Sequence, residues 1–206
     1  MNCCFSVLIS HGQNAKESPL YSRNEPDTSC TICPGSVWDN ENNVTAEDDV
    51  FSTVPLKNYL NCFQTNCFRS RYLYCLNFDF SIPANAVIDG IELQVKGMCD
   101  TPNSCLDSTL KLAISGFLTG TNMANSSYWS STNDFRTYGS ASELWGLPWV
   151  PEEINDSTFG VFIKIYNTKN ADVSAMIDYI AITVYYSTTT GSFSQLSTTN
   201  VMSVQQ

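Results

Sequence analysis

Apolar and polar residues alternate strictly in several stretches of the chain after residue 38. These runs occupy residues 76–82, 91–96, 110–115, 161–166 and 180–186, and polar, turn-rich loops separate them. A two-residue repeat is typical of strands that bury one face, because successive side chains point to opposite sides of a sheet. No comparable run has the repeat of an amphipathic helix. We therefore predict an all-β fold in which two antiparallel sheets pack as a β-sandwich of the jelly-roll type.

Composition divides the chain into three parts. Residues 1–36 lack a strand pattern and contain turn-forming prolines, which predicts an irregular N-terminal extension. Residues 37–187 contain the alternating runs and form the predicted sandwich domain. Residues 188–206 hold no charged residue and are rich in Ser and Thr, which predicts a polar C-terminal tail. A short helical turn is expected after Pro151, because proline and the two acids that follow it suit a first helical turn.

Both ends of the chain combine polar residues with spaced apolar ones. Such a segment can add as a strand to the sheet edge of another subunit, and the alternative is a mobile terminus. The candidates for assembly contacts are the apolar residues Phe5, Val7, Phe193, Leu196, Val201 and Val204. Residues 1–15 could alternatively be a cleaved secretion signal, although no basic residue precedes their short apolar stretch. A retained segment is the preferred interpretation.

The chain is acidic and poor in charged residues. Its 206 residues carry a formal net charge of −10, and only 15% of them are charged. No basic stripe is present to replace the counterions of a phosphate backbone, which argues against nucleic acid and anionic membrane surfaces as partners. No apolar run is long enough for insertion across a bilayer. A composition rich in uncharged polar and aromatic residues instead favours a protein that acts outside the cell.

The chain has nine cysteines, and six of them form pairs that are close in sequence. Cys62 and Cys67, like Cys99 and Cys105, enclose polar turn-forming residues, which predicts disulfide-closed loops in an oxidising compartment. Cys30 and Cys33 are a third disulfide candidate, or half of a zinc site that lacks its second ligand pair. The odd count leaves at least one cysteine without an intramolecular partner. Cys75 lies in a strand-like run and is predicted to be a buried free thiol.

Four aromatic residues form the candidate ligand site, namely Tyr128, Trp129, Trp145 and Trp149. On an open face their rings would stack on sugars, whereas the alternative is that they pack the edge of the sandwich. The acidic residues Asp39, Glu41, Glu47, Asp48 and Asp49 favour a solvated loop, with Ca²⁺ binding as the alternative. Their spacing is not that of an EF-hand. Asp178, in the last alternating run, is expected to pair with a lysine or arginine.

The motifs of common enzyme classes are missing from the sequence. There is one histidine, and no glycine-rich phosphate loop, nucleophile elbow or HExxH motif occurs. The 20 acidic residues are scattered, so a pair placed for glycoside hydrolysis is not indicated. We therefore predict no catalytic residues and no cofactor.

Four motifs occur in order across residues 37–187. They are the opening WDNENNVTAEDDVFST, the run LNFDFSIPANAVIDGIELQVKG, the stretch ASELWGLPWVPEEINDSTFGVFIKI and the final SAMIDYIAITVYYS. Together they resemble a β-sandwich module that recurs in phage virion proteins, such as tail and fibre components, and in bacterial surface or secreted proteins. The resemblance implies a structural or adhesive module rather than an enzyme. The cysteine-rich residues 62–75, the Cys99/Cys105 pair and the N-terminal extension depart from that pattern and favour a subunit displayed outside the cell.

The predicted function is therefore that of a non-enzymatic structural subunit of an extracellular assembly. The assembly would be a surface filament, a pilus-like polymer, or a virion fibre or capsid-associated component. The subunit would bind copies of itself through sandwich edges, which must be paired or guarded, and through its terminal segments. The alternative is an adhesion module that binds a cell-surface glycan or receptor through the four aromatic candidates.

Overall fold

The computed structural model describes residues 8–26, 35–58 and 68–190. Its strands are β1 (Leu8–Glu17), β2 (Tyr21–Glu25), β3 (Ser52–Leu56), β4 (Tyr72–Leu76), β5 (Ala86–Cys99), β6 (Cys105–Ile114), β7 (Phe117–Thr119), β8 (Asp134–Ser140), β9 (Gly160–Asn167) and β10 (Val173–Thr190). A 3-10 turn, η1 (Glu41–Thr45), and a short helix, α1 (Pro151–Ile154), complete the elements. The predicted helical turn after Pro151 is confirmed. Neither helical element in these ranges has the length and apolar character needed to cross a membrane.

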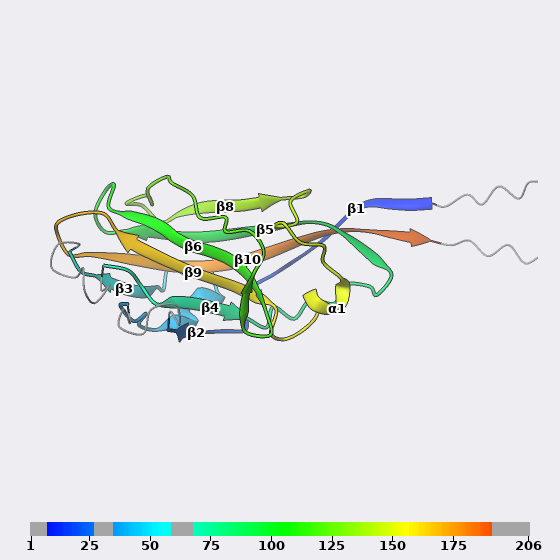
Figure 1. Cartoon of the computed structure of the whole chain (residues 1–206), viewed down its shortest axis with the longest axis horizontal. Helices are drawn as coiled ribbons and strands as arrows, with labels where there is room; N and C mark the ends of the chain where they lie inside the picture. The colour runs from blue at the N-terminus through cyan, green and yellow to red at the C-terminus, as the bar shows by residue number, and fades with distance from the viewer. Residues whose placement is uncertain (1–7, 27–34, 59–67, 191–206) are drawn as a thin grey trace, which may run out of the picture.

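The strands form two five-stranded antiparallel sheets that pack as a sandwich (Figure 1). Sheet A has the order β1-β10-β5-β8, and β3 pairs with the N-terminal part of β10 beside β1. Sheet B has the order β2-β4-β9-β6-β7. Apart from the β6–β7 hairpin, every connection between consecutive described strands passes from one sheet to the other. The predicted all-β, jelly-roll type of sandwich is confirmed.

The core lies between the sheets and is built from the apolar positions of the alternating runs. In sheet A, Leu93 pairs with Ile182, and in sheet B, Ile163 pairs with both Leu73 and Leu110. All five of these side chains are at most 1% exposed. Burying one such side chain contributes about 1.5–3 kcal/mol, so the pairing register is set by which face carries these residues.

The predicted irregular N-terminal extension is wrong for residues 8–25. β1 is an edge strand of sheet A, and β2 is an edge strand of sheet B. Neither strand shows an alternating sequence pattern, because an edge strand buries few side chains and therefore needs few apolar residues. In β1, for example, Gln13, Asn14, Lys16 and Glu17 are all exposed.

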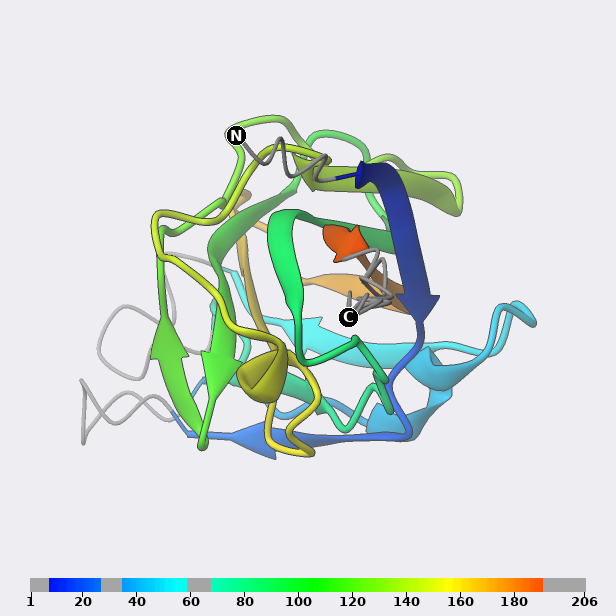
Figure 2. The same ribbon diagram turned by 90° about the vertical axis from the view of Figure 1, so that its right-hand side faces the viewer.

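β1 and β10 remain paired until the described chain ends. Leu8 lies opposite Thr190 and Glu17 opposite Ile182, with an irregularity between Ser10 and Gln13. The two strands project together from one end of the sandwich (Figures 1 and 2). β10 therefore continues past the predicted domain boundary at residue 187, because β1 supports it on one side and β5 supports it on the other as far as Thr188.

Candidate functional site

The predicted aromatic ligand platform is not formed. Trp129, Trp145 and Trp149 are 1%, 0% and 7% exposed, and only Tyr128, at 43%, presents its ring to solvent. Each indole N–H also has an internal acceptor: Trp145 donates to the backbone oxygen of Ile91 at 2.9 Å, and Trp149 donates to that of Leu144 at 2.9 Å. A buried tryptophan needs such a partner, so these rings serve the core. The sequence could not distinguish the two roles because both use the same residues.

Trp129 belongs to a buried polar cluster around Asp107 that the sequence did not reveal. Asp107 accepts hydrogen bonds from Trp129 Nε1 at 2.7 Å, from Tyr138 Oη at 2.9 Å and from the backbone N–H of Asn125 at 3.0 Å. Arg136 lies 3.7 Å from the same carboxylate. Burial and the Asp107 charge raise the pKa of Tyr138, so its hydroxyl stays a donor. The cluster joins β6 of sheet B to β8 of sheet A and closes that side of the sandwich.

A second buried carboxylate, that of Asp178, lies under the acidic loop. Asp178 is the extra residue of a bulge in β10, between the pairs Ile177–Gly97 and Tyr179–Lys96, and it is fully buried. Its Oδ1 accepts the backbone N–H groups of Asp48 and Asp49, at 3.2 and 2.8 Å. Its Oδ2 lies 3.0 Å from Lys96 Nζ and also accepts a hydrogen bond from Asn133.

The pairing that we predict for Asp178 is therefore confirmed, with Lys96 as its partner. Burial opposes ionisation of Asp178, but the donors from Asn133, Lys96 and the two loop amides outweigh it, so its pKa lies below the ordinary value. The pKa of Lys96 is raised, mainly because its ammonium group donates a hydrogen bond to the Asp178 carboxylate. The pair is ionised over the whole neutral range.

The carboxylates of the acidic loop lie around a lysine. Lys96 Nζ lies 3.0 Å from Glu47 and 3.5 Å from Asp49, so a lysine supplies the positive charge among these carboxylates. Within the described residues, no group of three or more His, Cys, Asp and Glu side chains is placed to hold a metal ion. Asp39 instead pairs with Thr53 through its backbone, and Glu41 lies in η1.

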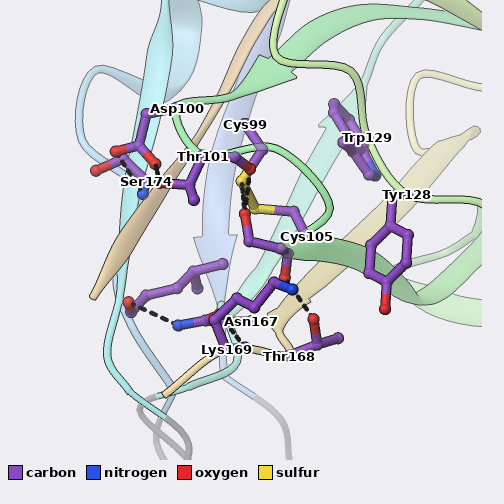
Figure 3. The surroundings of a disulfide bond; sticks show 12 residues. Cys99, Asp100, Thr101, Cys105, Tyr128, Trp129, Asn167, Thr168, Lys169 and Ser174 are labelled. Carbon is purple, nitrogen blue, oxygen red and sulfur yellow. Dashed lines mark hydrogen bonds between the residues drawn. A yellow bond between two sulfur atoms is a disulfide. The ribbon is translucent and has the colours of Figure 1, made fainter. Parts of the chain in front are cut away.

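The predicted disulfide between Cys99 and Cys105 is present and closes the β5–β6 connection (Figure 3). Both cysteines are fully buried. The enclosed loop is tied to the β9–β10 connection and to β10: Thr168 donates its N–H to Ser104 O at 2.8 Å, and Ser174 donates its N–H to Asp100 at 2.9 Å. The bridge therefore secures the end of the sandwich opposite the paired β1 and β10 ends.

The other cysteine predictions have different outcomes. Cys75 is a buried free thiol, as predicted, and burial raises its pKa. The remaining cysteine candidates, Cys30, Cys33, Cys62 and Cys67, lie outside the described residues. So do all the apolar assembly candidates, which are Phe5, Val7, Phe193, Leu196, Val201 and Val204.

Two of the outer strands have their free edge covered by polar groups of the chain. At the edge of β2, Ser22 donates its backbone N–H to Asn42 Oδ1 at 2.8 Å. Asn24, two residues on, exchanges hydrogen bonds with the backbone of Trp38. Beside β3, Thr53 exchanges both backbone hydrogen bonds with Asp39. The contacts of Ser22 and Thr53 occupy backbone groups that would otherwise template another strand, and the side chain of Asn24 holds the Trp38 backbone beside β2.

The remaining edges are those of β1, β7 and β8. β7 is only three residues long, although it exposes 73% of Phe117 at the hairpin tip. β1 and β8 are ten and seven residues long, and they form the two opposite edges of sheet A. Among the described residues, the candidate functional site is therefore a pair of sheet edges rather than the predicted aromatic platform.

The comparisons with known proteins find little. No family model matches the sequence, and no curated protein matches it. Two solved structures are among those similar to the chain. One is the CBM36-1 domain of a multidomain xylanase from the hindgut metagenome of Trinervitermes trinervoides, with a TM-score of 0.34, 14% identity, and coverage of 82% of this chain and 96% of that chain. Another is the cyanophage Pam1 capsid asymmetric unit, with a TM-score of 0.29, 17% identity, and coverage of 85% of this chain and 86% of that chain. At these TM-scores neither similarity bears on what the chain does.

Proposed function

We propose that the chain is a non-enzymatic structural subunit of an extracellular assembly, a surface filament or a virion component, which binds copies of itself. The observation that carries this proposal is the pairing of β1 with β10 out to Leu8 and Thr190. This pairing places both ends of the described chain side by side at one end of the sandwich, on an open sheet edge. A contact between subunits at this end of the sandwich is what the proposal expects.

The buried carboxylates support a structural role. A general acid or base must exchange a proton during the reaction and lie within reach of a substrate. Asp178 is fully buried, its oxygens are held by four donor groups, and its pKa is lowered. Asp107 is likewise surrounded by the groups that it joins. Both charges are committed to holding loops on the sandwich.

The alternative of a glycan- or receptor-binding module has less support. That function needs two or more rings on one open face. Of the four predicted rings, Tyr128 alone is exposed, so the site that would have carried this function is missing.

Negative-stain electron microscopy of the full chain tests the proposal, with a variant that ends at Thr190 as the comparison. The variant retains all of β10, and circular dichroism and a thermal melt verify that it is folded. We expect the full chain to form filaments or regular oligomers and the shortened chain to lose the larger ones. A full chain that stays monomeric at every concentration and salt would contradict the proposal. Repeating the experiment with reductant tests whether cysteines join the subunits.

A further inference from the structure

The free edge of β8 presents backbone groups of Phe135 and Thr137 to solvent. Ile91 and Cys99, on the neighbouring β5, donate their N–H groups toward β8, to Glu143 O and Ser130 O. Backbone N–H groups alternate sides along a strand, so Leu93, Val95 and Gly97 of β5 also face β8. Their partners in β8 are Tyr138, Arg136 and Asp134. The residues between these partners therefore direct their N–H and C=O groups outward.

The β8 edge is also the least guarded long edge of the sandwich. Natural edges are protected by lysines, prolines, bulges or covering segments. β1 has a lysine at position 16 and an irregularity between Ser10 and Gln13. β8, in contrast, contains neither lysine nor proline, and its seven pairs with β5 run without a shift; its irregular features are the inward-pointing Arg136 and the positive φ of Gly139. No other described strand covers its outer side.

We propose that β8 pairs antiparallel with β8 of a second copy of the chain, about a twofold axis at Thr137. This inference rests on the proposed function, because it supplies one of the contacts through which subunits bind each other. Thr137 is the midpoint of Asp134–Ser140, so this register alone pairs all seven residues. Two N–H···O bonds then link Thr137 to Thr137 of the partner subunit, and sheet A continues through both copies.

The side chains favour this register over its neighbour. It places Phe135, which is 48% exposed, opposite Gly139 of the partner subunit, where no side chain blocks the ring. It also leaves Arg136 and Tyr138 of each copy bonded to each other and to Asp107 within their own sandwich. A register centred on Arg136 would instead set two arginines against each other, which is unfavourable.

Sedimentation velocity on the full chain, at several concentrations, compares the native sequence with Thr137→Pro and Thr137→Val. Thr137 N–H lies outside the ladder with β5, so proline removes an outward donor and spares the sheet. Valine keeps the donor and is the matched control. We expect the dimer dissociation constant to rise at least about tenfold in Thr137→Pro, since two hydrogen bonds are lost, and to change little in Thr137→Val.

Hydrogen exchange on the native sequence gives a second measurement that needs no variant. The amides of Phe135 and Thr137 should exchange rapidly at low concentration and become protected as dimers form. An unchanged dissociation constant in folded Thr137→Pro, or amides that stay unprotected in the dimer, would overturn the β8 pairing. The proposed function would survive that result if the full chain still assembles. A full chain that is always monomeric would overturn both.

Discussion

Asp178 and Lys96 form an ion pair of 3.0 Å across two neighbouring strands of sheet A, with the carboxylate fully buried. The two residues lie on β10 and β5, at the bulge where the pairing of these strands shifts. The same carboxylate holds the backbone of the acidic loop through the N–H groups of Asp48 and Asp49. One buried charge thus connects a bulge, a lysine and a loop that are far apart in the sequence.

Replacing Asp178 should therefore be costly. In Asp178→Ala, the two loop amides lose their acceptor, the amide of Asn133 loses one of its two acceptors, and Lys96 loses its most buried partner. We expect the free energy of unfolding to fall by about 3 kcal/mol. Urea denaturation measures it. Asp48→Asn is the matched control, because that exposed side chain is outside the ion pair, and it should change stability little. Equal losses in both variants would contradict this account.

The same pair predicts how stability depends on pH. The pKa of Asp178 is lowered in the folded chain, so its contribution is present above the unfolded value of about 3.9 and is lost as the pH falls through the folded value. The pKa of Lys96 is raised, so its contribution is complete below about 10.4 and is lost only as the pH rises through the folded value. Denaturation of native and Asp178→Asn chains from acid to alkaline pH should show a smaller acid-side slope in the variant.

The cluster around Asp107 predicts a contrast between two neighbouring tyrosines. Tyr138→Phe removes a buried hydroxyl that bonds both Asp107 and Arg136, and we expect it to lower the free energy of unfolding by about 1–2 kcal/mol. Tyr128→Phe is the control, because Arg136 contacts only its backbone oxygen and its ring is exposed. Calorimetry that found the two variants equally destabilised would argue against a structural role for the hydroxyl.

The cysteines give a chemical test. Digestion without reductant by a protease that cleaves before Asp100 should release the peptides of Cys99 and Cys105 as one linked species. The Cys99→Ser/Cys105→Ser double variant should lose about 2 kcal/mol of stability. Cys75, which is buried with a raised pKa, should resist alkylation in the native chain and react fully in denaturant. Rapid labelling of native Cys75 would contradict its burial.

Sequence reasoning succeeded where one local signal decides the outcome. Alternation in residues 91–96 and 180–186 correctly predicts the central strands β5 and β10, because a strand buried on one face must alternate. The closeness of Cys99 and Cys105 correctly predicts their bridge, since a short polar loop closes easily. The signal failed for β1 and β2, whose exposed residues have no need to alternate. It also failed at residues 77–82, which alternate but lie outside any strand, because Asn77 and Asp79 have left-handed backbones.

The sequence by itself determined the architecture, two apolar faces that must pack against each other, since hydrophobic burial depends on the pattern of residue types along each strand. Only the tertiary structure decided which residues are buried, which form ion pairs and which strand edges are covered. It buried Trp129, Trp145 and Trp149 by placing an acceptor beside each indole, and it brought Lys96 to Asp178 across the bulge. It also covered the edges of β2 and β3 and left that of β8 open. Those outcomes depend on which distant groups the folded strands bring within hydrogen-bonding distance, and no local pattern encodes that distance.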